Sequence, residues 1–216
     1  MIVVTTPMCK QIVEWAGLDD FKVNRFPDQE EGDFAILLSE SKVKMDSLAI
    51  KINTFSQIKE SIKAVSDCLH EKNLIEKPID DESIQSIFKN YKDADDLKYA
   101  VLDESELNNI RGNNKGKKVK VYSEFLKDIV RDIGATVIDF KYDKDEKGEK
   151  NEGLENNLEL DFDYLVYPDY LEEEVFKRED LDAKDEKFIK ILSHNNISKD
   201  PILKAESRYD TLIEKL

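Results

Sequence analysis

The sequence predicts an α/β protein built from two small, duplicated Rossmann-like lobes, with mostly parallel sheets and a cleft between the lobes. An internal repeat, short strands joined by amphipathic helices, and near-continuous apolar strand cores such as Ala35–Leu38 support this prediction. Such apolar strands are typical of parallel sheets that helices cover on both faces. We expect a first lobe over residues 1–80, a helical and basic linker region over 81–117, and a second lobe over 118–216.

The internal repeat aligns residues 2–17 with residues 119–134 without a gap. The identical pairs are Val4/Val121, Lys10/Lys127, Ile12/Ile129, Val13/Val130 and Gly17/Gly134. Each copy is expected to form a strand, a hydroxyl N-cap at Thr6 or Ser123, and a helix that ends at the glycine. A second strand and a third strand led by Asp33 or Asp163 follow in both copies, so we infer an internal duplication.

The rest of the first lobe and the linker are predicted from caps and apolar spacing. A fourth strand is expected over 48–52, and Thr54 and Gln57 form a capping box before a long helix. The apolar stripe of that helix is Phe55, Ile58, Ile62, Val65 and Leu69. Another helix is expected over 83–91, and the Gly-Asn-Asn core of the basic cluster 111–120 predicts a turn.

The second lobe carries an acidic insertion over 141–160, which we expect to be a solvated loop rather than a calcium site. The apolar pattern of 187–192 fits a strand and a helix equally well. A final helix is expected to open at Asp200-Pro201 and to place one set of apolar residues on one side. That set is Leu203, Leu212, Ile213 and Leu216.

Composition excludes several classes of function. The chain has 216 residues and a net charge of -15, which disfavours nucleic acid and anionic membranes as partners. It has 2 cysteines, too few for a disulfide framework, and no apolar run approaches the roughly 18 residues of a membrane span. Met1 is followed at once by a predicted strand instead of a signal peptide. These features predict a cytoplasmic protein.

Motifs for catalysis and for zinc are missing from the sequence. There is no GxGxxG, P-loop, HExxH or GxSxG pattern, and 7 glycines give little material for a phosphate loop. His70 and His194 have no second His or Cys at ligand spacing, so zinc is not supported. The sequence therefore favours a binding or accessory protein over an enzyme.

In its order of elements the sequence resembles the lobes of helical-backbone substrate-binding proteins, which carry cobalamin, iron-siderophores, haem or metal ions. The segments that carry the resemblance are Val3–Gly17, Asp33–Leu37 and Ile50–Ile62. The likeness covers residues 1–75 well and 118–170 loosely, and the chain lacks an export signal and a lipobox cysteine. The resemblance implies the fold and an interlobe cleft, but not delivery to a transporter.

The sequence also resembles uncharacterised archaeal proteins that accompany methanogenesis, without a diagnostic motif. That resemblance implies a corrinoid, a nickel-tetrapyrrole or a metal ion as a cofactor, and the identity of the metal is unknown.

In open parallel sheets, ligands bind beyond the carboxyl ends of the strands, and this rule selects the candidate ligand-binding residues. They are Thr6, Cys9, Ser39, Glu40, Ser123, Glu124, Tyr167 and Asp169. A thiol in the first turn of a helix has a stabilised thiolate, so Cys9 is a candidate nucleophile or soft-metal ligand. Its repeat partner Leu126 favours packing instead, and simple N-capping by Thr6 and Ser123 is favoured over anion binding by the helix N-termini.

Three functions remain open from the sequence. The first is a cytoplasmic binding protein or chaperone that holds a small molecule or metallocofactor in the cleft. The second is an assembly factor whose acidic second half docks on a basic protein partner. The third is an enzyme of an unrecognised type.

Overall fold

The computed structural model describes residues 1–91, 97–138, 161–179, 186–193 and 198–216. They form two compact units, Met1–Leu102 with Asn196–Ser207 and Asp103–Asn195 with Arg208–Leu216. The cleft between the lobes stays a prediction. The acidic insertion and His194 lie outside the described residues. No described helix is long and apolar enough to cross a membrane.

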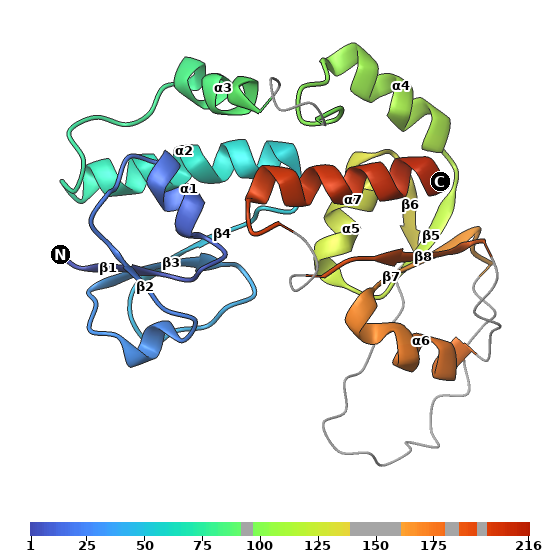
Figure 1. The fold of residues 1–216 in the computed structure, drawn as a ribbon, viewed down its shortest axis with the longest axis horizontal. Helices are drawn as coiled ribbons and strands as arrows, with labels where there is room; N and C mark the ends of the chain where they lie inside the picture. Colours follow the sequence, from blue (N-terminus) through green and yellow to red (C-terminus); the bar gives the residue numbers. More distant parts are fainter. Residues whose placement is uncertain (92–96, 139–160, 180–185, 194–197) are drawn as a thin grey trace. The chain divides into compact units, whose positions relative to one another are not determined.

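The first unit contains a four-stranded, fully parallel sheet (Figure 1). Its spatial order is β2-β1-β3-β4. The strands are β1 (Val3–Thr5), β2 (Lys22–Val23), β3 (Phe34–Leu38) and β4 (Ser47–Ile50). The inner strands β1 and β3 are almost fully buried, whereas β2 and β4 at the edges are largely exposed.

The second unit repeats this sheet with the same connectivity. Its order is β6-β5-β7-β8, and every pair is parallel. The strands are β5 (Lys118–Val121), β6 (Thr136–Ile138), β7 (Tyr164–Pro168) and β8 (Phe188–Ile191). The predicted α/β class with two parallel sheets is confirmed, and the open question over 187–192 is answered as a strand.

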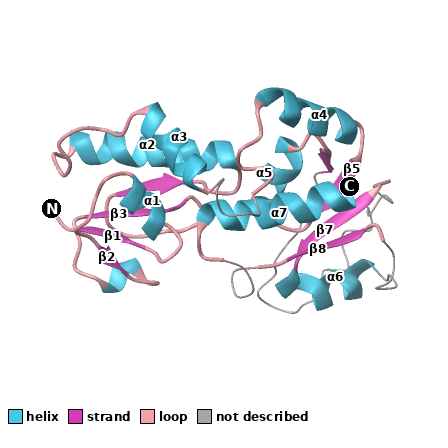
Figure 2. Cartoon of the chain, turned by 45° about the horizontal axis from the view of Figure 1, so that its top comes forward, coloured by secondary structure: helices cyan, strands magenta, loops and turns pink. Residues whose placement is uncertain are grey.

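Helices connect most of the strands, and Figure 2 shows the helices in cyan and the strands in magenta. In the first unit they are α1 (Lys10–Trp15), the 3₁₀ turn η1 (Pro27–Gln29), α2 (Phe55–Glu71) and α3 (Asp81–Asn90). In the second unit they are α4 (Glu104–Asn114), α5 (Glu124–Asp132), the 3₁₀ turn η2 (Asp169–Leu171) and α6 (Glu172–Glu179). The last helix, α7 (Pro201–Lys215), contributes residues to both units. Strand β4 directly follows β3, and α2, α3 and α4 follow one another before β5.

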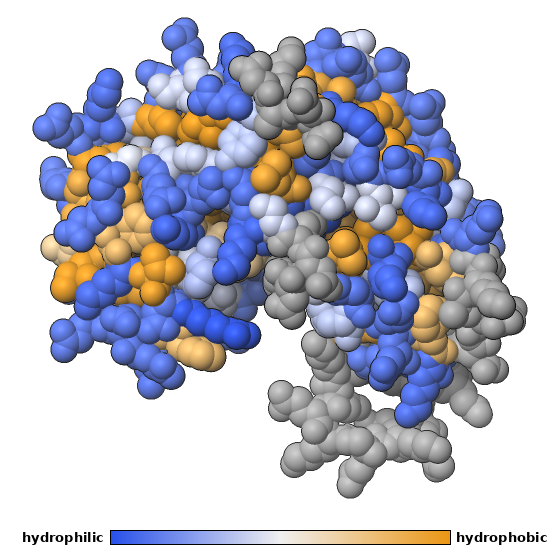
Figure 3. Space-filling model, viewed as in Figure 1, coloured by the Kyte–Doolittle hydropathy of each residue, from blue (hydrophilic) through white to orange (hydrophobic). Residues whose placement is uncertain are grey.

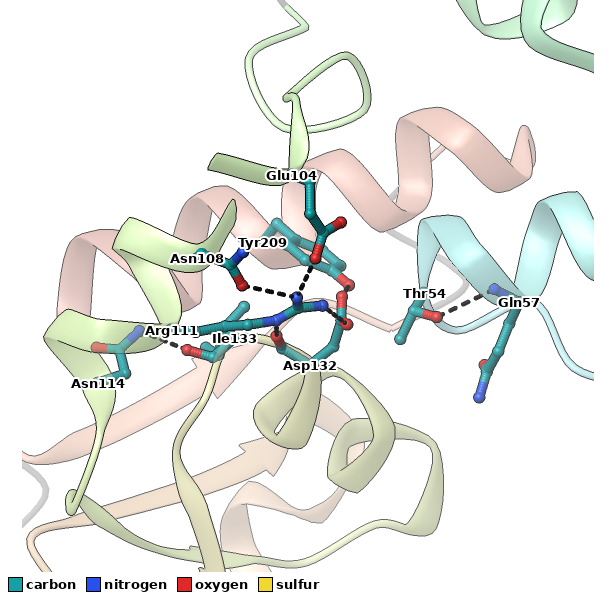
Figure 4. Close-up of polar contacts among 9 residues, drawn as sticks. All are labelled: Thr54, Gln57, Glu104, Asn108, Arg111, Asn114, Asp132, Ile133 and Tyr209. Carbon is teal, nitrogen blue, oxygen red and sulfur yellow. Dashed lines mark hydrogen bonds and ion pairs between the residues drawn. The ribbon is translucent and has the colours of Figure 1, made fainter. Parts of the chain in front are cut away.

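Local chemistry explains where the long helix α2 begins and which face it buries. The Thr54 side chain accepts a hydrogen bond from the Gln57 backbone N–H at 3.2 Å, as predicted (Figure 4). The Gln57 side chain accepts from the Asn53 N–H at 3.1 Å, so the reciprocal bond lies one residue earlier than in a standard capping box. The predicted stripe from Phe55 to Leu69 is buried.

The strand register corrects the ungapped repeat alignment by one residue. The Asp33 N–H donates to the Ile2 carbonyl and the Asp163 N–H donates to the Lys118 carbonyl, both at 2.9 Å. The Oδ2 atom of each aspartate also accepts a hydrogen bond from the backbone N–H of the same partner residue. Asp33 accepts from Ile2 at 2.6 Å, and Asp163 accepts from Lys118 at 2.7 Å. Ile2 is thus equivalent to Lys118, whereas Gly17 and Gly134 still match, so the first copy has one fewer residue between strand and glycine.

Two further predictions were wrong in detail. The Gly-Asn-Asn core of the basic cluster is the last turn of α4 and not a loop, because Arg111 and Asn114 donate to the end of α5. In α7, Leu203 is exposed. Of the predicted stripe, Leu212 is buried, and Ile213 and Leu216 are half-buried. The other buried residues of α7 are Pro201, Ile202, Lys204, Ala205, Glu206, Arg208 and Tyr209.

Candidate functional site

The carboxyl ends of the parallel strands are the predicted binding edges, one in each unit. In the first unit, Thr6 follows β1, and Ser39 and Glu40 follow β3. Ser39 and Glu40 are exposed, and the Ser39 N–H donates to the Ile50 carbonyl at 2.9 Å. Cys9 is fully buried, and the Thr6 side chain, the Glu40 carboxylate and the Leu38 backbone all lie near enough to affect the pKa of its thiol. The structure therefore brings Thr6, Cys9 and Glu40 together.

The Cys9 thiol lies in an environment that opposes its ionisation. Burial, which is the largest cause, and the nearby Glu40 carboxylate raise the pKa of Cys9 to about 11, against smaller effects of Thr6, Leu38 and Lys204. Helix α1 begins at Lys10, so Cys9 is its N-cap and not a first-turn residue. The expected stabilised thiolate is absent because loss of hydration outweighs the dipole of a six-residue helix. Cys9 behaves as a packed, protonated residue.

Neither predicted hydroxyl cap forms, which corrects the N-capping prediction. Ser123 occupies the N-cap of α5, but its side chain makes no capping hydrogen bond. Thr6 lies before the α1 N-cap, and its side chain interacts with the Cys9 thiol instead of capping the helix. The hydroxyl residue after each strand was therefore not a reliable sign of a capping hydrogen bond.

In the second unit the predicted residues have mixed surroundings. The Glu124 carboxylate is exposed and pairs with Lys127 at 2.6 Å. Asp169 is half-buried and accepts from the Ser193 N–H through Oδ1 at 3.1 Å. Tyr167 is buried in an aromatic cluster under α6, with its ring 5.8 Å from that of Phe176. Burial, and secondarily the Glu172 carboxylate, raise the pKa of Tyr167 to about 12.

Arg208 is the functional candidate that sequence reasoning missed. Its side chain is 3% exposed, and its Cζ lies 4.5 Å from the centre of the Phe125 ring in the first turn of α5. Burial lowers the pKa of Arg208 to about 10, with the Tyr170 hydroxyl acting in the opposite direction, so the guanidinium stays charged at neutral pH. Phe125 follows β5 and Tyr170 follows β7, which places Arg208 at the carboxyl edge of the second sheet.

A signal for Arg208 does exist in the sequence. Ala205, Arg208, Tyr209 and Leu212 follow the i, i+3, i+4, i+7 spacing of a buried helix face. A charged residue on such a face is buried with it and needs a partner. The predicted stripe ran through Leu203 instead of Ala205, and it therefore left this position out.

The donor set at these edges does not fit a bare metal ion. Within the described ranges, no group of three or more His, Cys, Asp and Glu side chains is placed to hold one. The one thiol near a strand end is protonated, and the Lys204 ammonium lies beside it, 3.4 Å from Met8 Sδ. A cation at this position repels a metal ion.

No family model and no curated protein matches the chain. In structure, it resembles the substrate-binding protein FpvC from Pseudomonas aeruginosa, solved in complex with Mn²⁺, at 13% identity and a TM-score of 0.45, over 100% of this chain and 97% of that one. It also resembles the laminin binding protein Lmb of Streptococcus agalactiae, titled a bifunctional protein with adhesin and metal transporting activity, at 11% identity and a TM-score of 0.44, over 100% and 96% of the two chains.

These similarities are too distant to assign a function. The structure resembles substrate-binding proteins, as the sequence did, but at low identity. Neither of the two matching structures concerns methanogenesis. The fold class stands on the two parallel sheets themselves. The predicted site residues and the ligand stay predictions.

Proposed function

We propose that this chain is a cytoplasmic binding or accessory protein that holds a small ligand at the carboxyl ends of its parallel strands. The observation that carries the proposal is the location of its unpaired polar atoms. Among the described residues, the buried Nε and Nη2 atoms of Arg208 have no hydrogen-bond partner. Arg208 adjoins the carboxyl ends of the strands of the second sheet, and open parallel sheets bind ligands at this edge.

The energetic argument supports a ligand for Arg208. A buried donor without an acceptor costs about 1–3 kcal/mol, and more when the group is charged. In native proteins nearly all buried polar groups have a hydrogen-bond partner. Two donors without a partner on one guanidinium therefore call for an explanation. A ligand that accepts from Arg208 would remove that cost, and the binding free energy would include the gain.

The proposal is tested by native mass spectrometry and thermal unfolding. The native mass of protein purified anaerobically is compared with its denatured mass and with a metal analysis of the same sample. The purified chain is then unfolded with a panel of organic acids, phosphate esters, polyols, amino acids, corrinoids, tetrapyrroles and divalent metal ions. A stoichiometric added mass, or a rise in Tm with any member of the panel, supports the proposal. A bare chain whose Tm no compound raises overturns it.

The assembly-factor alternative makes the opposite prediction for one deletion. A variant without residues 141–160 should keep ligand binding if the strand ends hold the ligand. It should lose a basic protein partner if the acidic insertion is the docking surface. An enzyme would instead show turnover that substitution of Cys9 or Glu124 abolishes.

A further inference from the structure

We infer that the second unit binds an oxyanion group of its ligand, a carboxylate or a phosphate, through the Arg208 guanidinium at the start of α5. This inference rests on the proposed function and names the chemical class that the ligand must carry. It stands on the geometry of the guanidinium, the lack of an acceptor for two of its nitrogens, and the helix terminus beside it.

The two unpaired nitrogens of Arg208 form one edge of the guanidinium. Nε–H and the Nη2–H that lies on the same side point in nearly the same direction, and together they match the two oxygens of a carboxylate or phosphate. Both nitrogens are buried without a hydrogen-bond partner in the described structure. The arrangement therefore matches the edge with which arginine binds an oxyanion through two hydrogen bonds.

A cation–π contact holds the guanidinium beside α5. The Arg208 Cζ lies 4.5 Å from the centre of the Phe125 ring, within the range of such a contact. The ring offers no oxygen or nitrogen acceptor, so it does not replace a hydrogen-bond partner for Nε–H and Nη2–H.

The start of α5 adds a second favourable element. Phe125 belongs to the first turn of this nine-residue helix, whose positive dipole end favours an anion. The Ser123 hydroxyl, the natural competitor for that end, makes no capping bond. The Glu124 carboxylate on the same turn is 80% exposed and forms an ion pair with Lys127.

A purely structural role for Arg208 makes a different prediction. If Arg208 served only to stack on Phe125, replacing it would destabilise the fold and would not change anion binding. If Arg208 is an anion site, its buried unpaired charge costs stability in the empty protein. An apolar side chain of similar length is then tolerated, because replacing a buried charge by a packed apolar group is often neutral or stabilising.

The test uses the full chain, with inorganic phosphate and succinate as probes against sodium chloride at equal ionic strength. Binding is measured by isothermal titration calorimetry and by the shift in Tm. The variants are Arg208→Met, Arg208→Lys and, as a matched control, Arg178→Met, whose arginine lies on α6 with 46% of its side chain exposed. Comparing the two probes shows whether carboxylate or phosphate is preferred.

We expect at least one probe to bind the native chain and raise its Tm. Arg208→Met should weaken that binding roughly tenfold or more, which is about 1.4 kcal/mol, while Arg178→Met leaves it unchanged. Arg208→Lys should recover only part of the affinity, because an ammonium lacks the two-pronged edge. Arg208→Met should unfold at a Tm no lower than the native chain when no probe is present.

Four results overturn the inference. These are equal probe binding by Arg208→Met, full recovery by Arg208→Lys, a marked loss of Tm in Arg208→Met without a probe, and binding of neither probe. If neither probe binds but a compound of the panel without a carboxylate or phosphate group does, the oxyanion inference fails and the binding function stands. If no compound binds, both fail.

Discussion

At the scale of single residues, burial decides the chemistry of the two cysteines. Cys9 is fully buried at a strand end, whereas Cys68 on α2 is partly exposed. Burial raises the pKa of both thiols, to about 11 in the case of Cys9. A thiol in this state packs like a small apolar side chain and is a poor nucleophile.

We expect Cys9 to resist alkylation in the folded protein. Iodoacetamide at mildly alkaline pH should modify Cys68 first, and Cys9 only at the rate at which the chain unfolds. The measurement is peptide mass spectrometry over time, with the same reaction in denaturant as the control. Rapid modification of Cys9 without denaturant would show that its thiolate is accessible.

The same thiol predicts a pH dependence of stability. The folded pKa of about 11 lies above the ordinary value of 9.0, so the folded state holds the proton more tightly. The stabilisation, of order 2–3 kcal/mol, is fully present below pH 9.0 and is lost as the pH rises toward about 11. Urea unfolding of the native chain and of Cys9→Ala over this range should show a smaller loss in the variant. Parallel curves would contradict this account of the thiol.

At the scale of elements, polar side chains fix helices that have little apolar surface of their own. In α4, Arg111 donates through Nε to the Asp132 carbonyl at 2.9 Å and through Nη2 to its carboxylate at 3.0 Å (Figure 4). Asn114 donates to the Ile133 carbonyl at 3.1 Å, and the Tyr209 hydroxyl donates to the second Asp132 oxygen. These bonds hold α4 and α7 against the end of α5.

The duplicated glycines offer a matched test of that packing. Gly17 and Gly134 both have positive φ, at 98° and 90°. A Cβ on Gly134 would lie 2.5 Å from the Arg111 carbonyl oxygen, whereas on Gly17 its nearest neighbour is Ile75 at 4.0 Å. Gly17→Ala should cost about 1–2 kcal/mol from its backbone conformation alone. Gly134→Ala should add about 1–3 kcal/mol, because α4 must move.

Chemical denaturation of the two glycine variants measures this difference. Hydrogen exchange should also show loss of protection across α4 in Gly134→Ala and not in Gly17→Ala. Equal destabilisation by the two substitutions would mean that α4 does not pack closely against the end of α5.

Helix α7 also carries a buried carboxylate, Glu206, that accepts hydrogen bonds from the backbone of another segment. Glu206 is 7% exposed and accepts from the backbone N–H groups of Lys98, Tyr99 and Ala100, with the last at 2.9 Å. The segment around residues 98–100 has no helix or strand of its own, so this carboxylate satisfies its donors.

We expect Glu206→Gln to destabilise the chain by about 1.5–3 kcal/mol, because an amide has only one acceptor oxygen for these N–H groups. Glu214→Gln on the exposed face of the same helix is the control and should change stability by less than about 0.5 kcal/mol. The measurement is the midpoint and slope of urea unfolding. A Glu206→Gln chain as stable as the control would show that the hydrogen bonds of the Glu206 carboxylate do not contribute to stability.

At the scale of the whole chain, duplication and charge are the dominant features. The two sheets share one strand order, and the chain has a net charge of -15. On the face that Figure 3 shows, hydrophilic residues alternate with hydrophobic areas. Excess charge of one sign destabilises a compact state through self-repulsion. The acidic balance therefore affects stability and the choice of partners more than it affects the fold.

We expect Tm to rise with sodium chloride from low to physiological ionic strength, because salt screens this repulsion within a Debye length of about 8–10 Å. A gain of 1 kcal/mol corresponds to roughly 2–4 °C for a chain of this size. Differential scanning calorimetry across a salt series measures it, with glycerol as an uncharged control. A Tm that falls steadily with salt would show that specific ion pairs outweigh the net charge.

Apolar spacing and the internal repeat are local properties, and they were sufficient to predict most strands and the helices α1, α2, α3, α5 and α7. The strand core around Ala35–Leu38, the start of α2 at Thr54 and the matching glycines at 17 and 134 all followed from neighbours in the chain. Helices α4 and α6 were not predicted, the hydroxyl caps at Thr6 and Ser123 did not form, and the repeat needed a one-residue gap.

Which polar groups are buried, and whether they are paired, follows from the three-dimensional packing. The raised pKa of Cys9 and the hydrogen bonds of Glu206 depend on contacts between segments far apart in sequence. Arg208 meets Phe125 across 83 positions of chain, by the difference of their residue numbers. Hydration is lost when distant elements pack together, so the free energy of a buried charge is a property of the fold and not of its local sequence.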